Sequence, residues 1–366
     1  MLSQQQIIQY LTDANPWWIT PAPPHEYQLY KRPVFYNLAK ELTLKQITSI
    51  VGLRRTGKTT LLKQLIGRLL EKERVNPKRI LFFNFEQNFI DLKSQLLEQI
   101  LYTYLQLTLQ TSLAELRDKI YVFFDEIQYI PSFQATLKRF YDLQPLIKFI
   151  ISGSASLFIR DGVKESLAGR IFETHVKPLG FSEFLALQNK PIEALPLDIT
   201  NITPREIEKR KLAIIPRLAS LERDFTTYIL KGQFPETLAF FDNEPKIREY
   251  LRDSILKKII ENDLPQFVPV DNPGEFATIF RVLASETGNL LSYQALASET
   301  SISQITVKKY IHYLEQTFLI SILYNYSKSE RPKKKFLKKH YLTSTNFAHA
   351  IIGLDAHTLF ETGALG

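Results

Sequence analysis

The feature that most constrains this chain is a glycine-rich turn that joins an apolar run to an amphipathic one. Ile47–Val51 has the length and β-branched content of a buried strand, and Lys58–Glu73 repeats leucine and isoleucine at helical spacing. The turn between them, Gly52–Thr59, reads G-x-x-x-x-G-K-T. A strand, such a turn and a helix, in this order, are typical of an α/β protein with a parallel sheet.

The chemistry of this turn indicates phosphate binding. Glycines let the backbone wrap so that its N–H groups point at phosphate oxygens, and the following helix adds its positive N-terminal dipole. We predict that the segment binds ATP, that Lys58 reaches the β- and γ-phosphates, and that the Thr59 hydroxyl ligates Mg²⁺. For Arg54 and Arg55 we favour a structural or partner-facing role over a catalytic one, because backbone amides already serve the phosphates. The predicted nucleotide-binding residues of the turn are Gly52, Arg54, Arg55, Thr56, Gly57, Lys58, Thr59 and Thr60.

A second apolar run, Lys119–Asp125, ends in two adjacent carboxylates. We expect this strand to deliver them beside the glycine-rich turn. Asp125 is then placed to hold Mg²⁺, and Glu126 to orient and deprotonate the attacking water. Gln128 is a polar relay or a helix-start residue, and we favour the latter. The two motifs together predict an Mg²⁺-dependent ATPase.

Strand-length apolar runs alternate with amphipathic stretches from Leu38 to Pro178. The alternation predicts a mostly parallel sheet with helices on both faces. The predicted strands are Ile47–Val51, Arg79–Phe85, Lys119–Asp125, Lys148–Ser152 and Ile171–Val176.

Beyond Pro178 the pattern becomes helical, which predicts a helical lid before a linker near Pro265–Pro273. Its predicted helices are Phe181–Gln188, Pro204–Glu222, Phe225–Leu230 and Glu244–Asn262. The predicted domains are an amino-terminal arm packed on the next domain (1–37), a P-loop ATPase domain (38–178), a helical lid or linker domain (179–265), a winged-helix domain (266–345) and a carboxyl-terminal tail (346–366).

Several motifs in succession resemble those of prokaryotic AAA+ ATPases that carry a carboxyl-terminal domain of unknown function. The motifs are GLRRTGKTT (52–60), FFDEIQ (123–128), LKRFYD (137–142), ISGSAS (151–156), LAGR (167–170) and PLGFSEF (178–184). The resemblance continues through YILKGQFPE (228–236) and residues 276–342, and so covers nearly the whole chain.

The resemblance implies an AAA+ sheet in which the strand Lys148–Ser152 lies between the P-loop strand and the Asp125 strand. It implies that Ser152 senses the γ-phosphate, although a turn serine is nearly as good an interpretation. It implies that Arg170 senses or completes a nucleotide site, in this subunit or a neighbour's, against the alternative of a surface ion pair. It also implies that Arg32 lies near the adenine, and that the protein forms a ring or partial ring.

Members of that family usually continue into a nuclease-like domain. In this sequence Ser344 and Asn346 stand where the family tends to have Asp and Gly, and no spaced acidic cluster with a lysine follows. We therefore assign no nuclease activity to this chain.

Residues 292–342 read as helix, turn, helix and two strands, the pattern of a winged helix. In the second helix, Ser303–Phe318, we expect Ile305 among the core residues with Ile311, Leu314 and Phe318. A basic segment, residues 328–340, holds seven Lys or Arg and one Glu, which is +6 of the net charge of +8. The predicted DNA contacts are Gln304, Thr306, Lys308 and Lys309 on the helix, and Lys333, Lys334, Lys335 and Lys338 on the wing. The alternative is a protein-interaction module or a spacer.

The composition limits the kinds of site and the cellular location that we expect for this protein. The chain has no cysteine, which excludes disulfides and thiolate metal sites, and no apolar run approaches the roughly 20 residues of a membrane span. The amino terminus lacks a signal pattern, so we expect a cytoplasmic protein. We predict an AAA+ ATPase that binds DNA and remodels or translocates on branched or junction DNA. The alternative is a nucleotide switch that regulates a protein partner. A DNA-binding regulator with a vestigial site is a weaker third, because the P-loop and both carboxylates are intact.

Overall fold

The computed structural model describes residues 3–86, 94–154, 167–191, 203–267, 270–325 and 338–353. The chain divides into two compact units, Met1–Val176 and Lys177–Gly366. Among the described helices, none is long and apolar enough to cross a membrane.

The first unit is built on a five-stranded sheet of order β2-β3-β4-β1-β5, in which every neighbouring pair is parallel. The prediction that the strand ending in Ser152 lies between the P-loop strand and the Asp125 strand is confirmed. Strands β1, β3 and β4 are buried along their whole length, which explains their continuous apolar runs. The strands are β1 (Ile47–Val51), β2 (Ile80–Asn84), β3 (Ile120–Asp125), β4 (Ile147–Gly153) and β5 (Ile171–His175).

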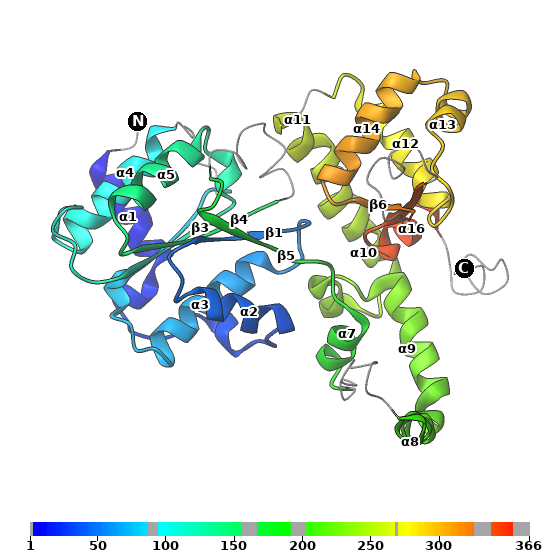
Figure 1. The fold of residues 1–366 in the computed structure, drawn as a ribbon, viewed down its shortest axis with the longest axis horizontal. Coiled ribbons are helices and arrows are strands. Elements are labelled where there is room, and N and C mark those ends of the chain that lie inside the picture. Colours follow the sequence, from blue (N-terminus) through cyan, green and yellow to red (C-terminus); the bar gives the residue numbers. More distant parts are fainter. Residues whose placement is uncertain are drawn as a thin grey trace. The chain divides into compact units, whose positions relative to one another are not determined.

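Helices cover both faces of this sheet, so the predicted α/β class is confirmed (Figure 1). Helices α2 (Pro33–Glu41) and α3 (Lys58–Glu71) lie on one face, and α4 (Gln95–Thr103) and α5 (Phe133–Leu143) on the other. Under α3, leucine and isoleucine side chains pack on Ile50 and Phe123 of the sheet. A short π-helix, η4 (Tyr104–Thr108), continues α4.

The amino-terminal arm packs on this unit, as predicted, but it begins with a helix that its sparse periodicity did not indicate. In α1 (Gln4–Ala14), the capping residue Ser3 accepts from the Gln6 N–H (3.2 Å), and its own N–H donates to the Gln6 side chain (2.8 Å). The Asn15 side chain then pairs with both main-chain groups of Phe82 (2.6 and 2.9 Å). The arm thus supplies backbone-like partners to the edge strand β2. Two 3₁₀ turns, η1 (Pro16–Trp18) and η2 (His25–Gln28), complete it, and a third, η3 (Pro77–Arg79), precedes β2.

The second unit opens with helices. The predicted break between residues 222 and 225 is wrong, because α9 (Leu218–Lys231) runs through it. The chain instead breaks at η7 (Ile215–Arg217), where Pro216 lacks the N–H that a continuing helix needs. The other elements up to residue 267 are α7 (Phe181–Leu187), α8 (Pro204–Ile214), η8 (Pro235–Phe240), α10 (Glu244–Glu249), the short π-helices η9 (Tyr250–Leu256) and η10 (Lys258–Asp263), and α11 (Leu264–Phe267).

Three helices and an antiparallel strand pair follow, and the last two helices and the strands come in the predicted order. They are α12 (Pro273–Ser285), α13 (Tyr293–Thr300), α14 (Gln304–Gln316), β6 (Ile320–Tyr324) and β7 (Lys338–Leu342). In addition, Leu290 pairs with Lys339 in an isolated antiparallel bridge.

The expectation that Ile305 belongs to the core of α14 is wrong, since its side chain is 82% exposed. The buried residues are Val307, Tyr310, Ile311 and Leu314, which share one helical face. Ile305 lies two positions before Val307, about 200° away around the helix axis.

A last described helix, α16 (Thr345–Ile352), begins one residue before the predicted tail. Its Asn346 is fully buried, accepts from the Gln233 N–H (2.9 Å) and donates to the Ile229 carbonyl (2.6 Å). Asn346, Phe347, Ala348 and His349 of the predicted tail are therefore buried in the second unit. The division into five domains otherwise stays a prediction.

Candidate nucleotide site

The glycine-rich turn has a backbone that only its own residue types accommodate. A Cβ atom on Gly52 would lie 2.2 Å from the carbonyl oxygen of Val176, and Gly57 has a φ of 91°. Inside the turn, the Thr56 hydroxyl donates to the Leu53 carbonyl (2.9 Å). The turn is thus a preformed loop whose shape depends on both glycines.

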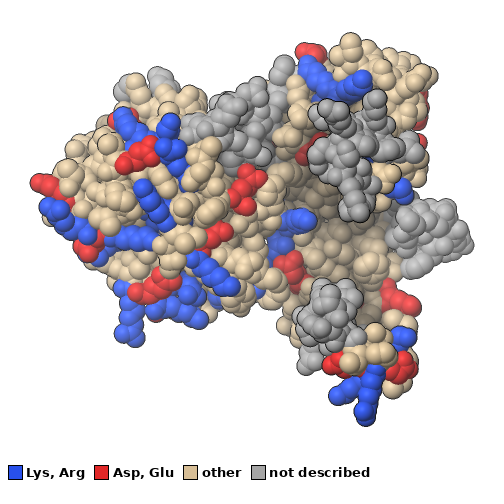
Figure 2. Space-filling view, in the orientation of Figure 1, with Lys and Arg blue, Asp and Glu red and all other residues tan. Residues whose placement is uncertain are grey.

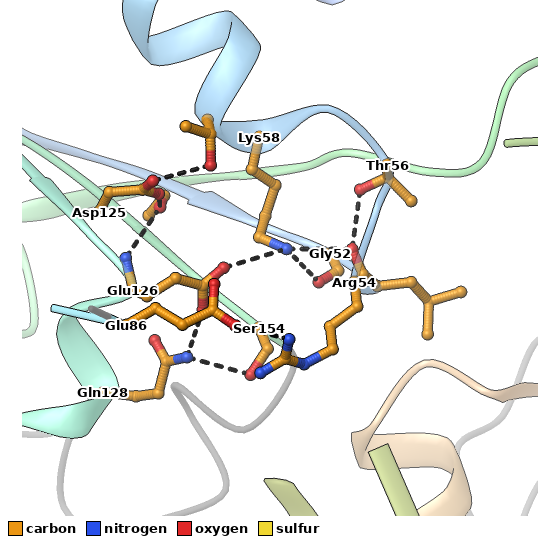
Figure 3. Close-up of polar contacts among 12 residues, drawn as sticks. Gly52, Arg54, Thr56, Lys58, Glu86, Asp125, Glu126, Gln128 and Ser154 are labelled. Carbon is orange, nitrogen blue, oxygen red and sulfur yellow. Dashed lines mark hydrogen bonds and ion pairs between the residues drawn. The ribbon is translucent and has the colours of Figure 1, made fainter. Parts of the chain in front are cut away.

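Lys58, the first residue of α3, is 4% exposed and points back across the turn (Figure 3). Its Nζ donates to the carbonyls of Gly52 (3.2 Å) and Leu53 (3.0 Å) and lies 3.6 Å from Glu126 Oε1. A phosphate oxygen is an anionic acceptor and a stronger partner than either carbonyl. This ammonium group can therefore exchange its neutral partners for a phosphate.

Asp125, at the end of β3, collects three donors. Thr59 Oγ1 (2.7 Å) and Asn84 Nδ2 (2.8 Å) donate to its Oδ2, and the Ser152 hydroxyl donates to its Oδ1. Burial and the neighbouring Glu126 charge raise the pKa of Asp125 to about 6, against the lowering effect of the Ser152 and Thr59 hydrogen bonds. A carboxylate and a hydroxyl in contact are hard oxygen donors, so this pair fits the ligand set that Mg²⁺ takes beside a phosphate.

Glu126 follows in a left-handed conformation, with a φ of 53° and 7% exposure. Its Oε1 faces Lys58, and its Oε2 accepts from the side-chain amide of Gln128 (Figure 3). The same Gln128 amide also donates to Ser154 Oγ (3.3 Å). The structure therefore joins Gln128 to Glu126, where we had favoured a plain helix-start role.

Ser152 contacts both Asp125 and Glu126. Besides its bond to Asp125, its hydroxyl accepts from the Glu126 N–H (3.2 Å). The interpretation as a turn serine therefore understates its contacts. A role in sensing the γ-phosphate stays a prediction.

The arginines of the predicted site lie around the turn. Arg54 donates to Glu86 (2.7 Å) and Tyr129 (2.9 Å), and Arg55 is exposed. The Arg32 guanidinium donates to the Thr56 carbonyl (2.9 Å), so it braces the turn itself. The contact of Arg32 with adenine stays a prediction. Thr60, on the first turn of α3, is half-buried.

Arg170 is not brought to this site within its own chain. It precedes β5, and its carbonyl accepts from the Ile47 N–H (2.8 Å) at the start of β1, whereas Gly52 follows the other end of β1. Five residues of strand, roughly 16 Å, separate the two levels. The guanidinium pairs with both oxygens of Asp142 (2.9 and 3.2 Å).

The predicted DNA contacts lie in the second unit, apart from Lys333, Lys334 and Lys335, which lie outside the described residues. Lys309 Nζ pairs with Asp271 (2.9 Å). The ammonium groups of Lys308 and Lys338 lie 5.9 and 5.4 Å from the centre of the Tyr293 ring. Gln304 is exposed, and Thr306, half-buried, has its hydroxyl within hydrogen-bond distance of Ser303 Oγ (2.8 Å). On the face shown in Figure 2, Lys and Arg are interspersed with Asp and Glu.

Comparisons with known proteins cover both parts of the chain. Residues 44–185 match the family model described as an AAA domain, and residues 222–358 match that of a domain of unknown function (DUF8612). The chain is 27% identical to an uncharacterized protein of Methanocaldococcus jannaschii over 88% of this chain and 67% of that protein. A second uncharacterized protein of that organism is 26% identical, over 82% and 62%. The chain thus spans about two thirds of the length of these relatives.

Two solved structures illustrate how distant the structural relatives are. One is the Aeropyrum pernix Orc1 protein in complex with DNA, at 14% identity, covering 92% of this chain and 96% of that one, with a TM-score of 0.36. Another is the Thermotoga maritima RuvB Holliday junction branch migration motor, at 14% identity, 97% and 96% coverage and a TM-score of 0.32. Likenesses at these TM-scores carry no inference about function.

The parallel sheet, with the glycine-rich turn after β1 and the carboxylates after β3, has the α/β fold of P-loop AAA+ proteins. Together with this fold, the match over residues 44–185 supports the assignment of that part of the chain to a P-loop AAA family.

Proposed function

We propose that this chain is an Mg²⁺-dependent ATPase that binds DNA through its carboxyl-terminal helices and strands. One observation carries the ATPase proposal: Lys58, Thr59, Asp125 and Glu126 meet at the carboxyl ends of the strands, as the contacting pairs Lys58–Glu126 and Thr59–Asp125. Each is the residue type that one part of phosphoanhydride hydrolysis needs.

In this proposal the backbone N–H groups of the turn and of the first turn of α3 hold the phosphates. Lys58 releases the carbonyls of Gly52 and Leu53 and binds phosphate oxygens. Thr59 and Asp125 hold Mg²⁺, which when bound neutralises charge on the phosphate oxygens. Arg32 keeps the Thr56 carbonyl in place, and so keeps the turn in its binding shape.

Glu126 orients a water molecule and takes its proton as the water oxygen bonds to the γ-phosphorus. The bond from that phosphorus to the bridging oxygen breaks, and ADP and phosphate are the products. Ser152 touches both the Asp125 carboxylate and the Glu126 N–H, and so can report a change at either residue to β4. Arg170, remote from this site in its own chain, would serve the site of a neighbouring subunit in a ring or partial ring.

The DNA part of the proposal rests on α13, α14 and the β6–β7 pair, with α14 as the helix that enters the major groove. Leu290 adds a single-residue pairing with Lys339 to the strand pair. Gln304 and Lys308 lie exposed near the start of α14. The basic segment, which includes Lys338, would contact phosphates, and ATP turnover would drive remodelling or translocation on branched DNA.

A second function is favoured by one observation. Ile305 is 82% exposed near the start of α14, and Lys309 beside it already pairs with Asp271. An exposed isoleucine and a lysine that is already paired with a carboxylate are better suited to binding a protein surface than to binding the phosphate backbone of DNA. The alternative is therefore a nucleotide switch whose carboxyl-terminal helices bind a protein partner.

The experiment compares ATP turnover with and without DNA and titrates duplex and four-way-junction DNA at several salt concentrations. Changing Lys333, Lys334, Lys335 and Lys338 to Ala should weaken binding to every sequence and flatten the slope of log affinity against log salt by about 2 to 4. Basal turnover without DNA should persist. An unchanged slope, or negligible DNA binding by both proteins at physiological salt, would favour the switch instead. Ile305→Ala is the variant that tests the nucleotide switch. If the protein is such a switch, this change should abolish binding of the protein partner and leave DNA affinity unchanged.

A further inference from the structure

Both carboxylate oxygens of Glu126 have a partner, and its backbone conformation is unusual. Its φ of 53° is a conformation that non-glycine residues seldom adopt, so the surrounding contacts must maintain it. Its Oε1 lies 3.6 Å from Lys58 Nζ, and its Oε2 accepts from Gln128. A residue that must present one oxygen to water therefore has its other oxygen fixed by Gln128.

The orientation of Gln128 is determined by chemistry. Gln128 lies in the 3₁₀ turn η5 (Ile127–Tyr129) and is 5% exposed. An ionised carboxylate only accepts hydrogen bonds, so the NH₂ end of the amide, and not its oxygen, must face Glu126. Among the described residues, the amide oxygen of Gln128 finds no donor. The two donations, to Glu126 and Ser154, therefore fix this side chain.

Strand β4 serves both carboxylates. Ser152 lies on β4 and bonds to Asp125, and Ser154, the first residue after the strand, bonds to Gln128. Residues two apart in an extended chain project to the same side. One run of extended chain thus holds Asp125 directly and Glu126 through Gln128.

From these contacts we infer that Gln128 is a positioning residue for Glu126: its amide, held by Ser154, fixes Oε2 so that Oε1 faces the attacking water once Lys58 turns to the phosphates. The inference rests on the proposed ATPase function. It makes Gln128 act only through Glu126, and that property separates positioning from a general structural role.

The first test measures single-turnover ATP hydrolysis and nucleotide affinity in parallel for Gln128→Ala and for Gln128→Met, which keeps a similar size, adds no charge and removes the donor. We expect both to lower the rate by about tenfold to 100-fold, as misplacement of a reacting group does, with nucleotide affinity within about twofold of the native protein. Ser154→Ala should lower the rate in the same direction by a smaller factor.

Gln144→Ala is the matched control. Gln144 is another buried glutamine of the same unit, and its amide donates to the Leu113 carbonyl (2.8 Å); it precedes the start of β4, whereas Ser152 and Ser154 lie at the other end of that strand. It should leave the rate unchanged at any temperature where the protein is folded. Equal losses in Gln144→Ala and Gln128→Ala, or parallel losses of rate and nucleotide affinity, would assign Gln128 a structural role only and overturn the inference.

The deciding test is the double variant. If Gln128 acts through Glu126, adding Gln128→Ala to Glu126→Gln should lower the residual single-turnover rate by less than about twofold, because the two changes remove one function. Multiplicative losses would overturn the inference while leaving the proposed ATPase function intact. Wild-type hydrolysis by Glu126→Gln itself would instead remove Glu126 from the mechanism, and the inference would fall with it.

Discussion

The strands of the five-stranded sheet end on two sides, which we call the carboxyl edge and the amino edge after the strand termini that lie there. Charged side chains are buried at both, but their partners differ. At the carboxyl edge, Lys58 is 4% exposed and lies against a second charged side chain, that of Glu126. At the amino edge, Lys148 is 1% exposed, and its Nζ donates to the Gln46 carbonyl and to the Thr48 hydroxyl. Both lysines donate to main-chain carbonyls, but Lys58 also lies beside a carboxylate, whereas Lys148 also donates to a neutral hydroxyl.

This difference teaches which buried charges indicate a site. Ligands of open parallel sheets bind beyond the carboxyl ends of the strands, where loops diverge. There the partners of Lys58 and Asp125 are the groups that a phosphate and Mg²⁺ would replace or join. Burial alone does not separate Lys58 from Lys148, whereas the identity of their partners does.

The largest expected effects belong to the carboxyl edge. Lys58→Ala should weaken ATP binding by about tenfold to 100-fold or more, since hydrogen bonds to charged groups contribute about 1.5–3 kcal/mol each. Glu126→Gln should bind ATP normally and lose about 10²–10⁴-fold in turnover, the range that a general base supplies. Fluorescent-nucleotide titration and phosphate release measure the two separately.

Lys148→Met sharpens this comparison as the control. It removes an equally buried lysine from the opposite edge, so nucleotide affinity and turnover should both stay at the native level. A loss of nucleotide affinity in Lys148→Met comparable to that in Lys58→Ala would break the distinction between the edges.

Arg170 also lies at the amino edge, yet we expect it to affect turnover. The expected loss of turnover is smaller than that of Glu126→Gln and depends on assembly of the subunits. If it completes a neighbour's site, Arg170→Ala should lower turnover in assemblies, and mixing it with Lys58→Ala should restore part of that turnover at shared interfaces. Asp142→Ala, which breaks the ion pair but keeps the arginine, should not lower turnover. If turnover does not recover in assemblies proven to be mixed, or if Arg170→Ala and Asp142→Ala lose turnover equally, the role of Arg170 is limited to its ion pair with Asp142.

The sequence predicted those features that depend on local spacing. The turn at residues 52–59 and the apolar runs fix strand, loop and helix within a few residues, and all five predicted strands form. The position of β4 between β1 and β3 came from the family resemblance and is confirmed.

Contacts that depend on which strands become neighbours were not predictable in this way. Asn84 donates to Asp125 across 41 residues of chain, and Gln128 reaches Ser154 across 26. No periodicity encodes these pairs, because the sheet order creates them. By contrast, the error at Ile305 was avoidable, since the phase of Val307, Tyr310 and Leu314 already excludes it from their face.

The smallest expected effect is a pH dependence of stability that arises at the amino edge. Burial lowers the pKa of Lys148 from its usual value of 10.5 to about 8, with Glu41 opposing and Lys119 adding to the shift. The folded state therefore favours the neutral amine. Between about pH 8 and 10.5 the unfolded chain binds more protons at this residue, so its contribution to stability rises with pH there. Each pH unit crossed adds at most about 1.4 kcal/mol to the free energy of unfolding, and each kcal/mol raises the melting temperature by roughly 2–4 °C.

Other groups titrate in the same window, so the measurement is the difference in melting temperature between native protein and Lys148→Met, taken at intervals from pH 7 to 10. The difference should shift in favour of the native protein as pH rises; a constant difference would mean that Lys148 keeps its charge in the folded state.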